Sequence, residues 1–92
     1  MEETVKLKVA AKSDPKSVAG AIVNYTREKK NIDIVVMGAN AVNQCMKAIA
    51  IANEYASSDG FEILCKPSFT HLELEGGKKS AMVIKIISKV KE

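Results

Sequence analysis

The sequence predicts an α/β protein of the α+β type, a βαβαββ two-layer sandwich in which both helices cover one face of a four-stranded mixed sheet. Three observations predict this fold. Hydrophobic periodicity changes along the chain in the order strand, helix, strand, helix, strand, strand. The second strand is almost continuously apolar, and a Gly-Gly pair separates the last two strands. A chain of 92 residues has room for one domain, expected to span residues 1–92.

The first strand and the first helix are predicted by their different periods. Apolar residues alternate with lysines over residues 5–9, as in a strand with one buried face. Helical spacing of apolar residues then predicts a helix over residues 15–30. Ser13 or Asp14 is expected to cap it, and proline is favoured in a first turn, whose N–H groups have no partner within the helix. The apolar positions of this helix are Val18, Ile22 and Tyr25.

The second strand and the second helix are predicted next along the chain. Residues 32–37 are rich in β-branched side chains, which favours a central strand covered on both sides. Gly38 ends this run, and a helix is expected from Asn40 to about Ser57. The predicted core stripe of this helix is Val42, Cys45, Met46, Ile49 and Ala52.

The last third of the chain is predicted to form two strands joined by a tight turn. Apolar residues alternate over residues 61–65, and Pro67, which has no N–H to donate, predicts an edge strand or a bulge. The alternation shifts over residues 69–74. A hairpin turn is expected over residues 75–78, because adjacent glycines supply the positive φ that such turns need. The final strand has Met82, Ile84 and Ile86 on its apolar side.

The composition excludes several classes of protein. With 47% hydrophobic and 27% charged residues, the chain is too apolar to be disordered, and it has no apolar run long enough to cross a membrane. Residues 1–4 are acidic rather than basic, which argues against a signal peptide and for a cytoplasmic protein. The formal charge of +3 is too small to identify a partner by itself.

No catalytic, cofactor-binding or metal-binding motif is evident in the sequence. The single histidine, His71, has neither a cysteine nor paired carboxylates near it along the chain, so we expect no enzyme activity. Cys45 and Cys65 are expected to be small buried hydrophobic residues rather than a disulfide or a metal site. We therefore expect no cofactor and no metal.

The most informative positions are the two turns that lead from a strand into a helix. In a βαβα arrangement both turns lie at one edge of the sheet, beyond the carboxyl ends of the parallel strands. Helix N-termini carry unpaired N–H groups and a partial positive charge, which favour a phosphate or another anion there. The candidate residues are Lys12, Ser13, Lys16, Asn40, Asn43, Gln44 and Lys47. Ordinary helix capping with solvated lysines is the alternative, and Asp14 in the first turn favours it.

Two further basic regions are predicted. Lys78 and Lys79 lie beside the Gly-Gly turn, and a hairpin tip of this kind can reach a nucleic-acid groove or simply be a soluble turn. The open face of the sheet is expected to present Lys6, Lys8, Lys85 and Lys89. That face lacks the aromatic side chains on which bases stack, so we expect its lysines to keep it soluble.

The second helix is apolar around most of its circumference, which indicates a contact beyond its own sheet. Ala48, Ile51 and Tyr55 continue an apolar band that begins at Gln44. Part of the band is expected to pack against the first helix. The remainder predicts a self-association surface, most simply that of a twofold homodimer.

Four blocks of the sequence carry a resemblance to a known family. They are SVAGAI (17–22), GANAVNQ (38–44), KAIAIA (47–52) and PSF (67–69). In these blocks the chain resembles the bacterial stage V sporulation protein S family, which is similar in turn to the Alba superfamily of small dimeric proteins that bind DNA or RNA. The resemblance covers nearly the whole chain and implies an Alba-like fold with a sheet ordered 1-2-4-3.

Some positions of the expected site match the Alba pattern and others do not. Alba proteins have paired lysines before the proline of the first turn, where this chain has Ser13 and Asp14. They have arginines around the second turn, where this chain has residues 38–40, Gly-Ala-Asn. The hairpin that reaches the nucleic acid in the superfamily matches residues 75–79. The polar groups that remain suit a few phosphates better than a long duplex.

The leading hypothesis is a non-enzymatic homodimer that binds DNA or RNA and acts as a regulator linked to sporulation or development. Lys12, Lys16 and Lys47 would neutralise phosphate charge, while Asn40 and Asn43 would donate hydrogen bonds. Two alternatives stay open. One is a regulatory module that binds another protein, and the other is a binder of small anions at the two helix N-termini.

Overall fold

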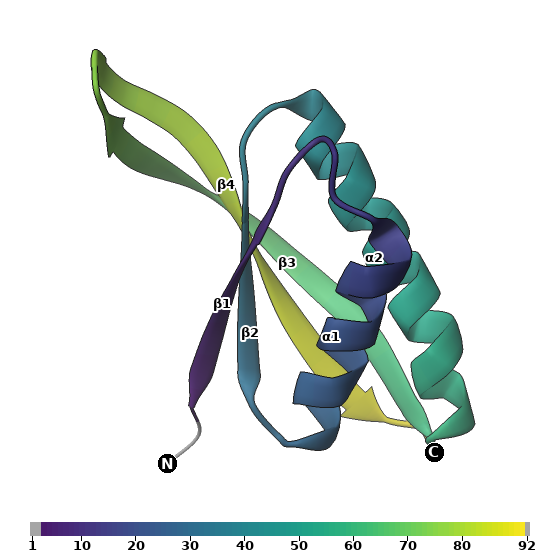
Figure 1. The fold of residues 1–92 in the computed structure, drawn as a ribbon. Helices are drawn as coiled ribbons and strands as arrows, with labels where there is room; N and C mark the ends of the chain where they lie inside the picture. The colour runs from purple at the N-terminus through teal and green to yellow at the C-terminus, as the bar shows by residue number, and fades with distance from the viewer. Residues whose placement is uncertain (1–2, 92) are drawn as a thin grey trace.

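The computed structural model describes residues 3–91 and confirms the predicted order of elements. The elements are β1 (Thr4–Val9), α1 (Pro15–Arg27), β2 (Asn31–Val36), α2 (Ala39–Ser58), β3 (Phe61–Leu74) and β4 (Gly77–Val90). The strands form one four-stranded sheet in the order β1-β2-β4-β3, as the resemblance implied. Both helices pack on the same face of this sheet (Figure 1). Met1 and Glu2, part of the acidic start, lie outside the described residues.

Strand β2 is an internal strand, as predicted. It pairs with β1 in parallel, Val5 lying opposite Ile32, and with β4 in antiparallel fashion, Ile84 lying opposite Ile34. Its two sides differ, because Ile34 is fully buried under the helices while Asp33 and Val35 on the other side are only half-buried. The expectation that β2 is covered on both sides is therefore wrong. Both helices lie on one face of the sheet, so its other face is open (Figure 1).

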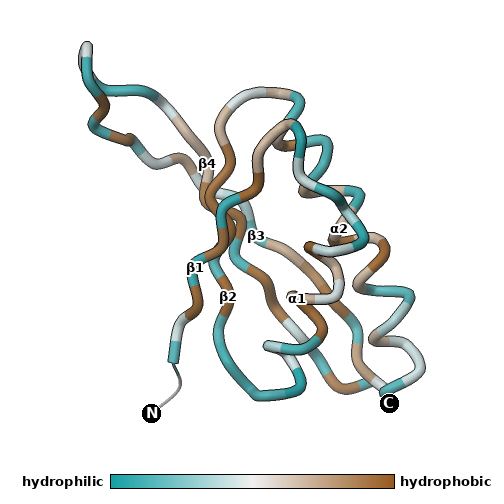
Figure 2. Tube along the Cα trace, viewed as in Figure 1, coloured by the Kyte–Doolittle hydropathy of each residue, from teal (hydrophilic) through white to brown (hydrophobic). Residues whose placement is uncertain are grey.

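The core lies between the sheet and the two helices. Ile22 from α1, Ile34 from β2, Cys45 from α2 and Ile84 from β4 are each at most 1% exposed. Burying one such aliphatic side chain contributes about 1.5–3 kcal/mol, so this layer provides most of the stability of a small domain. Figure 2 shows the hydrophobic residues along β2 and the hydrophilic turn that joins α1 to β2.

Helix α1 begins where the sequence predicts and ends earlier than predicted. Asp14 is its N-cap and Pro15 occupies its first turn. The helix ends at Arg27 rather than near Lys30. Lys29 takes a left-handed φ of 60°, and the Lys30 N–H donates to the Tyr25 carbonyl at 3.0 Å, which closes the helix before the two lysines.

Helix α2 has nearly the predicted length, but the exposure of two of its residues differs from the prediction. Met46, expected in the core stripe, is 38% exposed. Ala48, expected on the self-association surface, is 0% exposed within a single chain. The two helices pack side by side (Figure 1), and Gln44, one turn before Ala48, donates to the Ser13 carbonyl in the turn before α1. Ala48 therefore belongs to the core of the chain, and its expected place on an interface is wrong.

Strands β3 and β4 form a hairpin longer than the rest of the sheet. Their register runs from Phe61 opposite Val90 to Leu74 opposite Gly77, straight through Pro67, so β3 is the predicted edge strand and its pairing contains no bulge. β4 pairs with β2 only from Met82 to Ile86. Residues 70–81, the part of the hairpin between Phe69 and Met82, therefore leave the sheet as a two-stranded arm (Figure 1). Its turn is the predicted one, with φ of 93° at Gly76 and 123° at Gly77.

Candidate nucleic-acid interface

The turns that lead into α1 and α2 lie together at one edge of the sheet. β1 and β2 are parallel and end in register, Val9 lying opposite Val36, so both chains leave the sheet at the same edge (Figure 1). The Gln44 side chain of α2 donates from Nε2 to the Ser13 carbonyl at 2.9 Å and joins the two turns directly. We call residues 10–16 and 37–44, together with Lys47, the rim.

The first turn of the rim is held by its own hydrogen bonds. The Ala10 N–H donates to Ser13 Oγ at 2.9 Å, and the Ser13 N–H donates to the Ala10 carbonyl at 3.0 Å. Ser13 is therefore engaged by its hydroxyl, its N–H and its carbonyl, and its role is to shape the turn. Lys12 lies within this closed turn and is exposed.

The N-terminus of α1 already holds a carboxylate. Asp14 Oδ1 accepts from the Lys16 N–H at 3.1 Å, and Asp14 Oδ2 accepts from the Ser17 hydroxyl at 3.2 Å. This is the usual capping contact, and the negative charge also complements the helix dipole. The alternative reading of the first turn, ordinary capping, therefore describes Asp14 correctly. An incoming anion at this end meets Asp14 as well as Lys12 and Lys16.

The N-terminus of α2 is different because its N-cap is a glycine. Gly38 has φ 91° and ψ 154°, a conformation that other residues rarely adopt, and it has no side chain with which to cap the helix. A Cβ built on Gly38 would meet nothing within 4 Å, so the space beside it is open. Within residues 3–91, no side chain caps the first N–H groups of α2. The N-terminus of α2 therefore differs from that of α1, which the Asp14 carboxylate already caps.

The polar residues predicted on α2 form one exposed stripe. Asn40, Asn43 and Lys47 are spaced at i, i+3 and i+7, which places them on the same side of a helix, and all three are exposed. At a rise of about 1.5 Å per residue, Lys47 lies roughly 10 Å along α2 from Asn40. The stripe therefore extends the rim away from the sheet edge. Gln44, by contrast, is half-buried and turned toward the first turn.

The rim lysines are separate from the ion pairs of the molecule. Among residues 3–91 the ion pairs join Arg27 to Asp59 and Lys30 to Glu3 and Glu28. These pairs involve the residues at the end of α1 and in the turn after it, whereas the rim lies at the start of α1. Within the same part of the chain Lys12, Lys16 and Lys47 form no ion pair, so their ammonium groups are available to an anion.

The hairpin lysines project from the same edge as the rim. Met82 of β4 lies opposite Val36, the last residue of β2, so the part of β4 before Met82 extends past that edge. Lys78 and Lys79 lie in this part, next to the turn, and both are exposed. The arm carries them away from the sheet, as Figure 1 shows. They are part of the same edge of the molecule, although they do not join the rim itself.

The open face of the sheet carries lysines and acidic residues together. The register places Lys6 opposite Asp33, and Asp33 opposite Lys85. It also places Lys89 opposite Glu62. Because each acidic residue lies next to at least one of these lysines, the net positive charge of this face is reduced. This arrangement fits the expected role of keeping an open sheet face soluble better than it fits binding of a polyanion.

The predicted self-association residues have different surroundings. Ala48 is buried, Ile51 is half-buried against the core, and Tyr55 is 46% exposed. The most exposed aromatic side chain is Phe69, 79% exposed at the base of the arm. The sequence did not predict that Phe69 is exposed, because the alternation in β3 does not show where the pairing of β2 with β4 ends. The shift in alternation after Pro67 was a sign of this exposure.

Cys45 and Cys65 are both free thiols. Cys45 is buried as predicted, whereas Cys65 is half-buried, so the prediction that both are buried is wrong for Cys65. Burial raises the pKa of the Cys45 thiol to about 11, with a smaller contribution from Cys65. In the part of the chain that the structure describes, no group of three or more metal-ligating side chains is placed to hold a metal ion. No helix within residues 3–91 is long and apolar enough to cross a membrane.

A second concave surface lies at the other end of α1 and was missed by sequence reasoning. Its cavity of about 560 Å³ is bordered by the end of α1, the turn after it and the end of β4. Three of the residues that border it, Arg27, Lys29 and Lys30, lie close together in the sequence. Lys85 also borders the cavity, but the register places it beside Asp33 on the open face of the sheet.

One comparison with known proteins bears on these surfaces. The family model described as Stage V sporulation protein S (SpoVS) matches residues 5–89. The match includes both turns of the rim, the whole of α2 and the complete hairpin arm.

Proposed function

Since this chain belongs to the stage V sporulation protein S family, we propose that it is a non-enzymatic regulator that binds DNA or RNA as a homodimer in the cytoplasm. The family membership supports a sporulation-related regulatory role. The observation that carries nucleic-acid binding is the rim. The rim contains the α2 N-terminus, which no side chain caps, and three exposed lysines that form no ion pair among residues 3–91.

The rim suits a phosphodiester backbone better than a base. Lys12 and Lys16 at the first turn and Lys47 on α2 supply charge. Asn40 and Asn43 supply amide donors that can reach phosphate oxygens. The aromatic side chains needed for stacking are elsewhere, since Tyr25 and Phe61 pack against the core. Binding at the rim is therefore governed by phosphate contacts, and Lys78 and Lys79 on the arm would guide the strand.

Fluorescence anisotropy with duplex DNA, single-stranded DNA and RNA tests this function. With three to five phosphate contacts, the logarithm of the association constant should fall against the logarithm of salt concentration with a slope of roughly −3 to −4. The nucleic acid with the highest affinity at a fixed salt concentration identifies the preferred partner. Absence of binding to all three at low salt would contradict the proposal.

The homodimer part of the proposal is supported by exposed apolar side chains. Tyr55 is the member of the predicted surface with the largest exposed fraction, and Phe69 and Met46 are further exposed apolar residues. Sedimentation velocity of the wild type, Tyr55→Glu and Phe69→Glu distinguishes the two surfaces, because the variant on the true interface should sediment as a monomer. A wild type that stays monomeric at high concentration would rule out the dimer.

Phe69 also supports a second candidate function, that of a module that binds another protein. A phenylalanine that is 79% exposed is unusual on a free surface and typical of a contact site. The two functions differ in one readout. A protein-binding module would show weak or salt-independent retention of nucleic acid, and Ile51→Asp or Phe69→Glu would abolish capture of its partner without changing that retention.

A further inference from the structure

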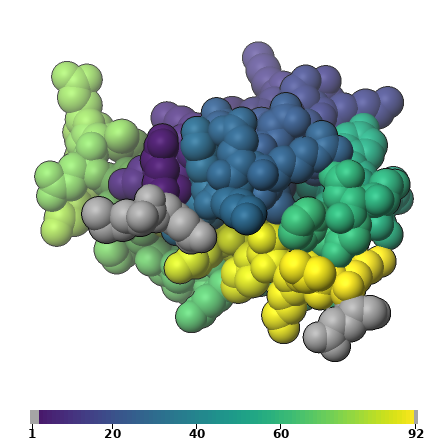
Figure 3. Space-filling view, turned by 90° about the horizontal axis from the view of Figure 1, so that it is seen from below, coloured from purple at the N-terminus to yellow at the C-terminus, as the bar shows by residue number. Residues whose placement is uncertain are grey.

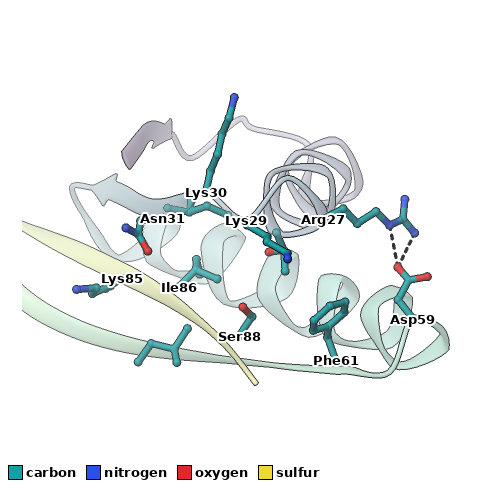
Figure 4. A pocket seen from close by; sticks show the side chains of 12 residues that line it. Arg27, Lys29, Lys30, Asn31, Asp59, Phe61, Lys85, Ile86 and Ser88 are labelled. Atoms are coloured by element: carbon teal, nitrogen blue, oxygen red, sulfur yellow. Dashed lines mark hydrogen bonds and ion pairs between the residues drawn. The ribbon is translucent and has the colours of Figure 1, made fainter. Parts of the chain in front are cut away.

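The open face of the sheet presents a regular arrangement of side chains on the side away from the helices. Successive side chains of a strand point to opposite faces, so Ile86 of β4 is buried toward the helices while its neighbour Lys85 is exposed on the open face. In Figure 4, Lys85 points away from Phe61 and the end of α1. Figure 3, which shows the molecule from below, shows α1 (blue) against one side of β4 (yellow).

A row of charged side chains crosses the open face from one edge of the sheet to the other. The register places Lys6 of β1 beside Asp33 of β2, and Asp33 beside Lys85 of β4. It also places Lys85 beside Lys66 of β3. Among residues 3–91 no ion pair engages any of these four side chains. The row therefore contains three lysines and one aspartate, and its excess positive charge is not neutralised by an ion pair.

Lys66 and Lys85 are an unfavourable pair in the absence of a ligand. They lie directly opposite each other in the antiparallel pairing of β3 with β4, and both are exposed. Like charges in such positions destabilise a sheet. A carboxylate from outside the chain, placed between the two ammonium groups, would replace this repulsion by two attractive contacts. The pair therefore favours an acidic ligand.

Two apolar pairs flank the charged row. Val35 lies opposite Val83 on one side of it, and Leu64 lies opposite Ile87 on the other. All four side chains are half-buried. At about 3.3 Å per residue, each pair is about 6.6 Å from the row, so the two pairs are roughly 13 Å apart. A complementary ligand has an acidic group between two apolar groups. A nucleic-acid backbone has no groups that would cover the apolar pairs.

An amphipathic helix offers this spacing. With a rise of about 1.5 Å per residue, residues i, i+4 and i+8 of a helix are about 6 Å apart in succession and lie on the same side. Apolar residues at i and i+8 with an acidic residue at i+4 therefore match the open face, and helices are the usual cover of a sheet face. With Lys8 and Lys89 at its borders, this face carries five lysines against Asp33 and Glu62, so further acidic residues of the helix would also be attracted.

We propose that the open face of the sheet binds an acidic amphipathic helix of a partner protein. An acidic side chain of that helix lies between Lys66 and Lys85, and its apolar side chains contact Val83 and Ile87. Phe69 lies on the other side of the sheet, since it pairs with Met82 on the side of the helices. The open face is therefore a different surface from the one that contains Phe69, and it does not depend on the function proposed for the rim.

NMR titration of the isotopically labelled chain with a synthetic peptide tests the proposal. The probe is an alanine-based helical peptide of about 18 residues with leucine at i and i+8 and glutamate at i+4 and on the flanks of that side. Binding should be saturable below about millimolar peptide, with the largest shifts at Lys66, Val83 and Lys85. A peptide of the same composition in scrambled order should bind at least about fivefold more weakly. Equal binding of the two peptides, or shifts confined to the rim, would overturn the proposal.

Lys66→Glu is the decisive variant because it places a carboxylate opposite Lys85 within the sheet. The melting temperature should stay the same or rise, while affinity for the peptide falls at least about fivefold. Lys12→Glu on the rim makes the same change in charge and should leave peptide affinity unchanged. Equal peptide affinities of Lys66→Glu and the wild type would refute the assignment. The salt dependence of nucleic-acid binding should be the same in Lys66→Glu, and a shallower slope would show that the open face binds a polyanion instead.

Discussion

Asp14 has two opposite effects on the rim. Its carboxylate caps α1 through the Lys16 N–H and the Ser17 hydroxyl, and it also places a negative charge beside Lys12 and Lys16. A capping residue is worth about 0.5–2 kcal/mol, while a charge near a helix N-terminus is worth about 0.3–1 kcal/mol. Asp14 is therefore expected to stabilise α1 and to weaken the binding of an anion at the rim.

Substitution of Asp14 separates the two effects. Asp14→Asn keeps a capping oxygen and removes the charge, so stability should change little and nucleic-acid affinity should rise about two- to fivefold. Asp14→Ala should raise affinity by a similar factor and lower the free energy of unfolding by about 0.5–2 kcal/mol. Urea denaturation and anisotropy titrations of both variants measure these changes. Unchanged affinity in both would show that the anion does not approach the start of α1.

Cys45 makes the stability of the fold depend on pH in the alkaline range. Burial raises the pKa of its thiol from 9.0 to about 11, so the folded chain retains this proton after the unfolded chain has lost it. Stability is therefore complete below about pH 9 and falls as the pH rises toward about 11, by on the order of 2 kcal/mol. Urea denaturation of the wild type and Cys45→Ala at about pH 8 and pH 11 isolates the effect. Equal losses in the two proteins would contradict it.

At the scale of elements, the sequence predicts the strands and helices well and their ends less well. A nearly continuous run of β-branched residues identified β2, while the period of the apolar residues identified β1 and α2. It did not identify the end of α1, because Lys29 adopts a left-handed conformation that nothing in its residue type favours. It also missed the arm, whose length depends on where β2 ends rather than on residues of β3 and β4.

Alanine substitution is expected to change stability in opposite directions at two glycines, Gly38 in the turn between β2 and α2 and Gly20 in α1. Gly38→Ala should lower the free energy of unfolding by about 1–3 kcal/mol, because φ of 91° strains any other residue even though the space beside it is open. It should also weaken nucleic-acid binding, since the first N–H groups of α2 would be displaced. Gly20→Ala, in the interior of α1 with equally open space, should raise stability by about 0.5–1 kcal/mol. Thermal or urea denaturation of both variants measures these changes, and unchanged stability in Gly38→Ala would contradict the role given to Gly38.

At the scale of the whole molecule, the positions of the basic residues matter more than the net charge of +3. The fold places lysines at the rim and on the arm along one edge, and it places other lysines next to Asp33 and Glu62 on the open face of the sheet. The sequence predicted the rim, because parallel strands bring their carboxyl ends together. It did not predict the concave surface at the end of α1, because the residues of α1 and β4 that border it are far apart in the sequence.

The most direct measurement compares two triple variants with the same change in charge. One replaces Lys12, Lys16 and Lys47 of the rim by alanine, and the other replaces Lys6, Lys8 and Lys89 of the open face. Anisotropy titrations over a range of salt concentrations give the slope for each. If the rim contacts the phosphates, the first variant has a slope shallower by about 2–3 and the second keeps the slope of the wild type. Equal slopes in the two variants would contradict binding at the rim.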